Sequence, residues 1–512
     1  MILLIHQNAE QVKKVLKGET EINISATFCT KALWEMAEKF PDEIIGWCEE
    51  KYKSNLDLEK WPQVFHQNLI MASYAVENAF FSGSIGYIDQ LPFVNVNRDV
   101  LYPTWQMSRD VGGIKGETLL KFKSHFQEIN NFEFLLNSIA KIGQQNGLFC
   151  YSAPELVNQH SIKILKNRAT TAQLFSFVYK YYNTIWVSVL FWCYFKYEKK
   201  FPLTSYLQAF FEKKFFLKNV DLSTIKIQSN KISKISNSID VIIPTMGRPK
   251  YLMQVIKDLS FQNLLPKKII VVEQNPDLDS ISELSEIHSK SWPFEIIHHF
   301  IHQTGACNAR NIALKEVNSD WIFLADDDTR LKSDLLEKCI KEVNRLGVSS
   351  INMNCKQKGE VTVFKKIKQW GSFGSGTSIV NSAFAKQCTF STIYEHGYGE
   401  DTDFGMQLRQ LGCDIIYHPD IQILHLKAPL GGFREKPILE WEQEEPQPKP
   451  SPTVMAFAFK YYTPQQINGF KSSLFFKFYS KQEKNNPITY IREMKERWKK
   501  SEAWAIKLIN GV

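Results

Sequence analysis

The sequence has few features that would place it in an oxidising compartment. Its nine cysteines are scattered, none forms a Cys-x-x-Cys pair, and their number is odd. This pattern favours reduced thiols and argues against a disulfide scaffold or a zinc site. The first residues, MILLIHQNAEQ, lack the basic segment and the long apolar run of a signal peptide. We therefore expect the chain to be cytoplasmic.

Long hydrophobic runs are also missing. The most apolar stretch, YNTIWVSVLFWCYF at 182–195, is too short to cross a bilayer, and Lys180 and Lys196 flank it. One interpretation is a buried helix, and the other is a helix lying at a membrane surface. The net charge of +8 is spread out, and its densest basic run is MKERWKK at 494–500. Such a run is usually a solvated face, although a membrane surface or a phosphorylated glycan would also fit it.

From 239 to 325 the sequence alternates short apolar runs with helical spacing of apolar residues. This alternation predicts a parallel sheet with helices on both faces. Ligands of such sheets lie beyond the carboxyl ends of the strands. Three segments follow expected strand ends: 245–248, Glu273 and the aspartates at 326–328. We therefore expect these segments to meet in one cleft.

The stretch WIFLADDDTRLKSDLLEK at 321–338 ends an apolar run in three aspartates. Crowded carboxylates raise each other's pKa unless a positive charge neutralises them. Mg²⁺ or Mn²⁺ does so with carboxylate, water and phosphate oxygens as ligands. The alternative is a capped helix start, which explains Ser333 and Asp334 but not three consecutive aspartates. No P-loop pattern is present, which argues against an NTPase.

A second acidic group stands in EHGYGEDTDFGMQLRQLGCDIIYHP at 395–419. Glu400, Asp401 and Asp403 precede an expected helix at 404–411, where carboxylates would complement the helix dipole. The nearby glycines also suit general-base work on a hydroxyl group. His425, on the strand that follows, is either structural or the completing ligand of an oxygen-rich metal site.

Four motifs occur in a fixed order: VIIPTMGRP, GACNARNIAL, FLADDDTRL and GYGEDTDFGMQLRQLG. Their content and order resemble those of inverting glycosyltransferases of family 2, over residues 240–434. The resemblance implies the GT-A fold, an α/β, Rossmann-like, mostly parallel sheet with helices on both faces. It implies a metal-dependent hexosyltransferase that moves a sugar from a nucleotide-sugar, expected to be a UDP-sugar, to a hydroxyl group of a glycan or glycolipid.

The resemblance also implies roles for single residues. Asp401 would take the proton of the acceptor hydroxyl, with Glu400 as the alternative base. Mn²⁺ or Mg²⁺ would be bound by Asp326, Asp328 and His425. The nucleotide-sugar would be bound by Thr245, Arg248, Glu273, Arg310, Asn311, Asp326, Asp327, Trp370 and Arg434. Either Arg434 or Lys427 would neutralise charge on the departing nucleoside diphosphate.

The N-terminal part contains a weaker copy of the same pattern. ALWEMAEKFPDEIIGWCEEKYKSNLD at 32–57 resembles ALKEVNSDWIFLADDDTRLKSDLL at 313–336, and 55 residues separate both Trp105 from His160 and Trp370 from His425. The two matches predict an internal repeat. In this copy INNFEF at 129–134 would replace GEDTDF, so no aspartate base is expected. We predict a catalytically inactive unit that binds acceptor or scaffolds a dimer, whereas the alternative is an unrelated domain.

Four segments are therefore predicted: a degenerate GT-A-like domain at 1–160, a helical connector at 161–235, the catalytic GT-A domain at 236–436, and a linker with a basic helical tail at 437–512. The expected partners are a nucleotide-sugar donor and a glycan or lipid-linked glycan acceptor used in bacterial surface or exopolysaccharide synthesis. No nucleic-acid partner is expected. Peripheral association with the inner face of the plasma membrane and homodimerisation are compatible with this prediction. The competing hypotheses are a non-enzymatic glycan-binding or scaffold protein and a nucleotidyltransferase. The latter would need a Gly-rich, Arg-containing phosphate loop at the first strand.

Overall fold

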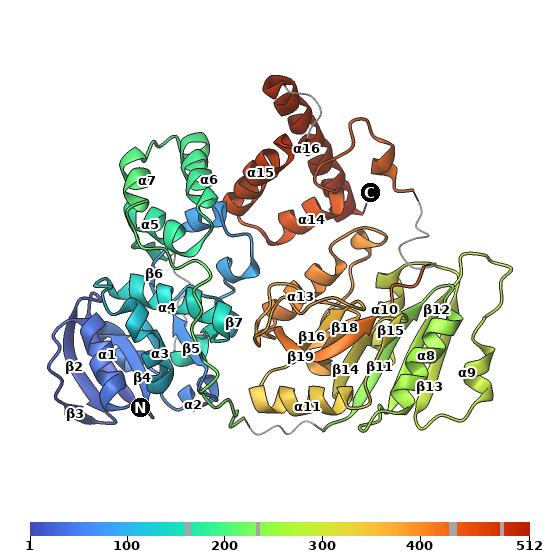
Figure 1. Cartoon of the computed structure of the whole chain (residues 1–512), viewed down its shortest axis with the longest axis horizontal. Helices are drawn as coiled ribbons and strands as arrows, with labels where there is room; N and C mark the ends of the chain where they lie inside the picture. Colours follow the sequence, from blue (N-terminus) through green and yellow to red (C-terminus); the bar gives the residue numbers. More distant parts are fainter. Residues whose placement is uncertain (159–164, 232–235, 430–437, 482–485, 512) are drawn as a thin grey trace. The chain divides into compact units, whose positions relative to one another are not determined.

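The computed structural model describes residues 1–158, 165–231, 236–429, 438–481 and 486–511. The chain forms two compact units, which Figure 1 shows in colours that follow the sequence. Unit 1 contains Met1–Lys231 and Tyr462–Ser480, and unit 2 contains Ile232–Tyr461 and Lys481–Val512. The predicted connector therefore lies mainly in unit 1, and the predicted tail is divided between the units. Within the described residues, no helix is long and apolar enough to cross a membrane.

Unit 2 is built on a nine-stranded sheet with the order β13-β12-β11-β14-β18-β16-β19-β15, and β17 also pairs with β19. The strands are β11 (Ile239–Thr245), β12 (Lys268–Gln274), β13 (Glu295–Ile301), β14 (Trp321–Ala325), β15 (Thr329–Arg330), β16 (Ser350–Lys356), β17 (Lys368–Gln369), β18 (Thr377–Asn381) and β19 (Ile416–His425). Strands β11 to β14 are parallel, as are β16 and β19, whereas β18 is antiparallel to both of its neighbours. The apolar runs are buried on both faces, which confirms the predicted α/β class.

Helices cover both faces of this sheet. The described helices of unit 2 are α8 (Pro249–Ser260), α9 (Ser285–Ser289), α10 (Ala306–Lys315), α11 (Leu335–Leu346), α12 (Ser382–Ala385), α13 (Glu400–Gln410), α14 (Pro452–Tyr461) and α16 (Pro487–Asn510). Helices α10, α12 and α13 share one apolar core with the sheet, and α8 and α11 lie against the other face (Figure 1). Helix α8 buries Leu252, Val255, Ile256 and Leu259, whose spacing forms one apolar stripe.

Helix α13 begins earlier than the sequence predicts. The expected start was 404, whereas the helix starts at Glu400. Its first turn therefore contains Glu400, Asp401 and Asp403, where the partial positive charge of the helix end favours carboxylates. The backbone of Gly399, with φ of 123°, allows the chain to turn into this helix.

Unit 1 contains an eight-stranded sheet with the order β3-β2-β1-β4-β8-β5-β9-β7. Its strands are β1 (Ile2–Gln7), β2 (Gln11–Lys17), β3 (Thr20–Ile22), β4 (Ile44–Glu49), β5 (Ile70–Tyr74), β7 (Tyr102–Pro103), β8 (Val111–Lys115) and β9 (Phe149–Ser152). A separate two-stranded sheet pairs β6 (Asn78–Ala79) with β10 (Lys166–Asn167).

Five strands of unit 1 repeat five strands of unit 2. The series β1-β4-β8-β5-β9 and the series β11-β14-β18-β16-β19 have the same order and the same pattern of parallel and antiparallel pairs. The two sheets differ in the strands that pair with the outer edge of β1 in unit 1 and of β11 in unit 2. Unit 1 has the antiparallel strands β2 and β3 there, whereas unit 2 has the parallel strands β12 and β13. The described part of unit 1 thus has no counterpart of the parallel strands β12 and β13.

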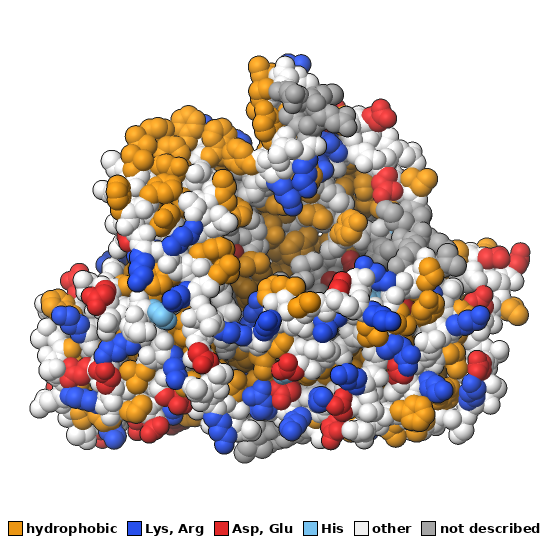
Figure 2. All heavy atoms as spheres, viewed as in Figure 1, with side chains coloured by type: hydrophobic (Ala, Val, Ile, Leu, Met, Phe, Trp, Pro, Cys, Tyr) orange, Lys and Arg blue, Asp and Glu red, His pale blue; other side chains and the backbone are white. Residues whose placement is uncertain are grey.

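The helices of unit 1 are α1 (Cys29–Lys39), α2 (Trp61–Val64), α3 (Gly116–Phe126), α4 (Phe132–Asn146), α5 (Thr171–Tyr181), α6 (Ile185–Cys193), α7 (Leu203–Ala209) and α15 (Pro464–Tyr479). The apolar stretch 182–195 forms α6 and the start of a π-helical turn, Tyr194–Glu198. Hydrophobic side chains gather on the surface over α6 and α7 (Figure 2).

Candidate active site

A cavity of about 440 Å³ opens in unit 2 at the carboxyl ends of β11 and β14. Among the predicted site residues, its lining includes Thr245, Arg248, Arg310, Asp326, Asp327, Asp328, Glu400, Asp401 and His425. Lys427, the second candidate for neutralising a leaving group, also lines it. The parallel strands thus bring together residues that are up to 180 positions apart in the sequence.

Asp327 is held inside this cavity by its neighbours. Its carboxylate accepts hydrogen bonds from Thr245 Oγ1 at 2.7 Å and from Arg248 Nη1 at 2.8 Å. Burial raises the pKa of Asp327 to about 6, because desolvation outweighs the stabilising charge of Arg248. Thr245 and Arg248 therefore position this carboxylate within the cavity wall.

Asp328 and His425 form a pair at the edge where β15 meets β19. His425 Nε2 lies 3.2 Å from Asp328 Oδ1, and the Ala428 N–H donates to Asp328 Oδ2 at 2.9 Å. Burial opposes ionisation of Asp328, but these hydrogen bonds and the nearby charges outweigh it and lower its pKa. The hydrogen bond with Asp328 raises the pKa of His425.

Asp326 differs from the other two aspartates because its side chain is 37% exposed. Its Oδ1 lies 3.3 Å from Arg310 Nη2. A methyl group on Gly376 would overlap its carboxylate, so a glycine is needed at the start of β18 to leave room for it. Asp326 is thus the aspartate of the three that is open to a ligand.

The donor types of this wall fit a divalent cation. Asp326 and Asp328 supply carboxylate oxygens and His425 supplies an imidazole nitrogen on one side of the cavity. Within the described residues, no group of three or more His, Cys, Asp or Glu side chains is arranged to hold a metal ion. In this structure Asp328 and His425 bond to each other, so ion binding would require them to exchange this contact for the ion.

Asp401 lies on the α13 side of the same cavity. Its Oδ1 accepts hydrogen bonds from the backbone N–H of Ser375, at 3.1 Å, and from the Ser375 hydroxyl. Burial raises the pKa of Asp401 to about 7, although Arg310 acts in the opposite direction. Burial also raises the pKa of Glu400. A carboxyl group with a pKa near 7 is suited to accept a proton at neutral pH.

Glu395 is a cavity residue that the sequence did not single out. Its Oε1 and Oε2 accept the N–H groups of Cys307 and Asn308, at 3.1 and 3.0 Å, at the start of α10. Gln274 accepts the N–H of Gly305 at 2.5 Å in the same turn. A helix start of this kind attracts anions, and Glu395 occupies that position. The only sequence signal was its place as the first residue of the EHGYGED motif.

Three predicted ligands of the nucleotide-sugar are not among the residues that line the cavity. Glu273 is buried and bonds to His298 at 2.9 Å and to Ser282 at 2.5 Å. Asn311 bonds through its side-chain amide to both backbone groups of Phe390. The ring of Trp370 stacks on Tyr417 with a centroid distance of 4.9 Å. In this structure these three side chains contact other parts of unit 2, and their roles in nucleotide-sugar binding stay predictions. The fourth predicted ligand, Arg434, lies outside the described residues.

In unit 1, buried side chains occupy the strand ends that correspond to the cavity of unit 2. The register of β4 places Glu49 at the position of Asp326. When the starts of α4 and α13 are aligned, Glu133 falls at the position of Asp401, whereas the sequence comparison places Asn131 there. Glu49 lies 3.5 Å from His6 Nδ1 and 3.6 Å from Arg109 Nε, and all of these side chains are buried. Burial raises the pKa of Glu133 to about 7.

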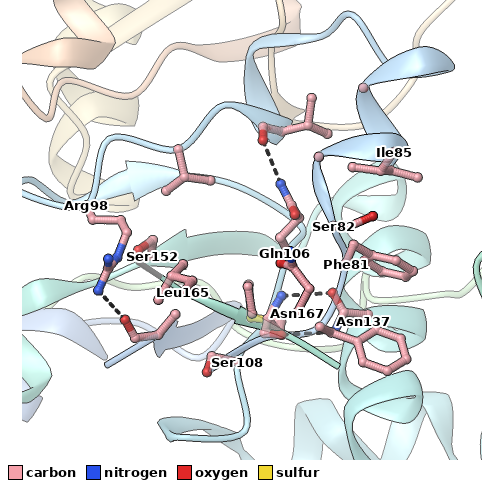
Figure 3. A pocket seen from close by; sticks show the side chains of 18 of the residues that line it. Phe81, Ser82, Ile85, Arg98, Gln106, Ser108, Asn137, Ser152, Leu165 and Asn167 are labelled. Atoms are coloured by element: carbon pink, nitrogen blue, oxygen red, sulfur yellow. Dashed lines mark hydrogen bonds between the residues drawn. The ribbon is translucent and has the colours of Figure 1, made fainter. Parts of the chain in front are cut away.

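Unit 1 has a cavity of about 220 Å³ elsewhere, beside the carboxyl ends of β5 and β9 (Figure 3). Its polar lining includes Gln106, Ser108, Asn137 and Ser152. The side-chain amide of Asn137 accepts from the N–H of Met107 and donates to the carbonyls of Met107 and Glu133. The side chain of Gln106 donates to the carbonyl of Val94 at 2.8 Å. Among the described lining residues there is no aspartate, glutamate or histidine, so this wall supplies neither a carboxylate base nor cation ligands.

Comparisons with known proteins agree with the site in unit 2. Residues 240–396 match the family described as Glycosyl transferase family 2. Unit 2 contains a glycosyltransferase family 2 domain. This match, with the observed sheet order, confirms the GT-A-type fold predicted for the region.

The chain is similar to a curated protein described as an uncharacterized glycosyltransferase, YwdF, of Bacillus subtilis strain 168. The two are 30% identical over 105 residues, which are 20% of this chain and 38% of YwdF. The chain thus matches well under half the length of this curated relative.

Solved structures with some likeness include TarS 1-349 of S. aureus, alone and in complex with UDP-GlcNAc. They are 15% and 16% identical to this chain, cover 53% of it and 80% and 81% of their own chains, and give TM-scores of 0.37 and 0.38. These scores are low, and the likeness carries no conclusion about the site of unit 2.

Proposed function

We propose that unit 2 is a glycosyltransferase that transfers a sugar from a nucleotide-sugar to a hydroxyl group, with inversion at the anomeric carbon. The observation that carries this proposal is Asp401, a carboxyl group with a pKa of about 7 in the same cavity as Asp326, Asp327 and Asp328. In this proposal Asp401 would accept the proton, and the three aspartates would form the wall that meets the donor diphosphate. The family match to residues 240–396 supports the same activity.

In the proposed reaction Asp401 takes the proton of the acceptor hydroxyl as its oxygen bonds to the anomeric carbon. The bond between that carbon and the phosphate oxygen breaks, and the nucleoside diphosphate leaves with the bonding electrons. Ser375 holds Asp401 through two donors, which orients the carboxylate for this step. Arg248, Arg310 and Lys427 line the cavity and place positive charge near the leaving group.

A divalent cation, Mn²⁺ or Mg²⁺, is part of this proposal. Asp326, Asp328 and His425 would hold it, and when bound it would neutralise charge on the donor diphosphate. The donor would be a UDP-sugar, as the resemblance to family 2 implies. The acceptor would be a glycan or lipid-linked glycan of a bacterial surface or secreted polysaccharide.

The test is the release of nucleoside diphosphate by the full chain, measured with Mn²⁺ or Mg²⁺, a set of nucleotide-sugars and a panel of glycan acceptors. We expect acceptor-dependent release that Asp401→Asn reduces about 10²- to 10⁴-fold. Asp420→Asn, at an exposed aspartate on β19 of unit 2, serves as the control and should keep the wild-type release. Unchanged turnover in Asp401→Asn would overturn the assignment of the base. Nucleotide and metal binding without transfer to any acceptor would favour the non-enzymatic alternative.

A further inference from the structure

Unit 1 carries a large exposed apolar surface on α6, α7 and the segment that follows α7. Its most exposed members are Ile185, Phe195, Phe201, Leu207, Phe211 and Leu217, which are 52% to 90% exposed. We call these residues, together with Trp192, the aromatic patch. Scattered apolar residues are normal on a protein surface, but a contiguous group of this kind marks an interaction site.

Ring contacts join Trp192, Phe195 and Phe201 of the patch. Trp192 lies 6.3 Å from Phe195, and Phe195 lies 6.2 Å from Phe201, between ring centroids. Trp192 also lies 6.0 Å from Phe476 of α15, which extends the surface onto a second part of unit 1. Figure 2 shows hydrophobic side chains gathered over α6 and α7.

Basic residues surround this surface. The segment 185–218 contains six lysines but only two glutamates, Glu198 and Glu212. Both glutamates already pair with lysines, Glu198 with Lys200 at 3.1 Å and Glu212 with Lys180 at 2.7 Å. Lys196 lies over the ring of Trp192, so positive charge borders the apolar side chains directly. The surface therefore combines exposed aromatic rings with an excess of positive charge.

We propose that the aromatic patch docks unit 1 on an anionic phospholipid membrane. The phenylalanine and leucine side chains would enter the boundary between headgroups and acyl chains, while the lysines contact the acidic headgroups. Helix α6 has nine residues and lies in the plane of such a surface rather than across it. A second copy of the chain fits less well, because each face would bring six lysines against six more.

This inference does not depend on the proposed transfer reaction. It concerns unit 1, whereas the proposed chemistry uses residues of unit 2. A membrane-bound enzyme would nevertheless meet lipid-linked acceptors at a raised local concentration.

The test is co-sedimentation of the full chain with vesicles of phosphatidylcholine alone and with vesicles that also contain phosphatidylglycerol. We expect binding to the anionic vesicles that weakens with added salt, and at least about tenfold weaker binding to the neutral ones. Phe211→Asp should weaken binding to anionic vesicles about tenfold, since Phe211 is 90% exposed. Lys213→Glu with Lys214→Glu should weaken it by a similar factor.

The matched control is Ile281→Asp, an equally exposed apolar residue of unit 2 that should leave vesicle binding unchanged. Transfer to a soluble acceptor should be the same in Phe211→Asp and the wild type, which separates this proposal from the proposed function. Failure of the wild type to bind anionic vesicles would overturn the proposal. A dimer that Phe211→Asp converts to a monomer, without vesicle binding, would instead make the patch a protein interface.

Discussion

Three consecutive aspartates follow β14, and each meets a different environment. Asp327 is buried between Thr245 and Arg248, Asp328 pairs with His425, and Asp326 remains partly exposed. The sequence predicts that these carboxylates share a cleft, because they follow a strand end. It cannot assign their separate environments, since the side-chain partners of Asp327 and Asp328 are 79 to 97 positions away in the sequence.

The pKa of Asp401 makes the activity of unit 2 depend on pH. A base must be deprotonated to act, so kcat/KM should rise about tenfold per pH unit below pH 7 and level off above it. The Ser375 hydroxyl and N–H stabilise the charged carboxylate, so Ser375→Ala should move this inflection to higher pH. Rate profiles between pH 5.5 and 9 would measure both. An inflection that survives in Asp401→Asn belongs to another group.

The pair of Asp328 and His425 gives a prediction for the metal. Chelation of divalent cations should abolish transfer, and His425→Ala should raise the Mn²⁺ concentration for half-maximal activity at least about tenfold. His418 is the control on the same strand, because it bonds to Glu342 at 3.0 Å away from the cavity. His418→Ala should lower the melting temperature and leave the metal dependence unchanged. Equal metal dependence in His425→Ala and the wild type would remove His425 from the ligand set.

Two acidic residues of α13 lie in different environments, one at the cavity and one in the protein interior. Asp401 faces the cavity, whereas Asp403 is fully buried and bonds to Lys460 and Tyr461 of α14, both at 2.8 Å. Asp403 thus ties α13 to the C-terminal helix α14. Both residues stand in the same turn of the sequence motif, so their spacing alone cannot separate a base from a structural anchor.

Removal of the Asp403 carboxylate should therefore destabilise unit 2. Asp403→Ala removes the carboxylate that accepts from Tyr461 and Tyr394 and pairs with Lys460, at a cost of about 2–4 kcal/mol. Asp401→Asn should unfold at the wild-type denaturant concentration or above it, because burial disfavours its charged form. Urea unfolding of both variants would measure this contrast. Equal losses of stability would show that Asp401 is a structural residue as well.

Prediction from sequence succeeds best for whole elements. The alternation of apolar runs and helices identifies the sheet of unit 2, because a parallel sheet buries its strands on both faces. Contacts of single side chains are harder, as Glu273 shows. It stands near the carboxyl end of β12, but His298 on the neighbouring strand and Ser282 in the next loop satisfy its carboxylate. Such local pairing depends on side-chain reach across the sheet, which apolar spacing does not encode.

At the scale of the whole molecule, the chain contains the strand series of one sheet twice. The repeated part is the half-sheet from β11 to β19, and the parallel strands β12 and β13 have no counterpart in unit 1. The sequence similarity at 32–57 and the equal Trp-to-His spacing predict this repeat. The starts of α4 and α13 bring Glu133 opposite Asp401, whereas the sequence comparison brings Asn131 there.

The pairing of Asp401 with Glu133 predicts that chemistry occurs once in each chain. Glu133 is buried near Glu49 and Arg109, whereas Asp401 faces an open cavity. Glu133→Gln should therefore keep the turnover of the wild type, whereas Asp401→Asn should lose about 10²- to 10⁴-fold. Nucleoside diphosphate release by the two variants, measured side by side, would test this. A comparable loss in Glu133→Gln would mean that unit 1 contributes a second base.

Stability provides an independent measurement on the same variant. Folding raises the pKa of Glu133 from 4.5 to about 7, so the folded chain binds this proton more tightly than the unfolded chain. The contribution of Glu133 to stability is therefore present below about pH 4.5 and is lost as the pH rises through 7. Glutamine carries no charge at any pH, so Glu133→Gln should match the wild type near pH 4.5 and exceed it by up to about 3 kcal/mol at pH 8. Urea unfolding at both pH values would show this difference. A variant that is less stable than the wild type at pH 8 would mean that the Glu133 carboxylate is held by a favourable ion pair with Arg109, and the position in unit 1 would then be a structural charge pair.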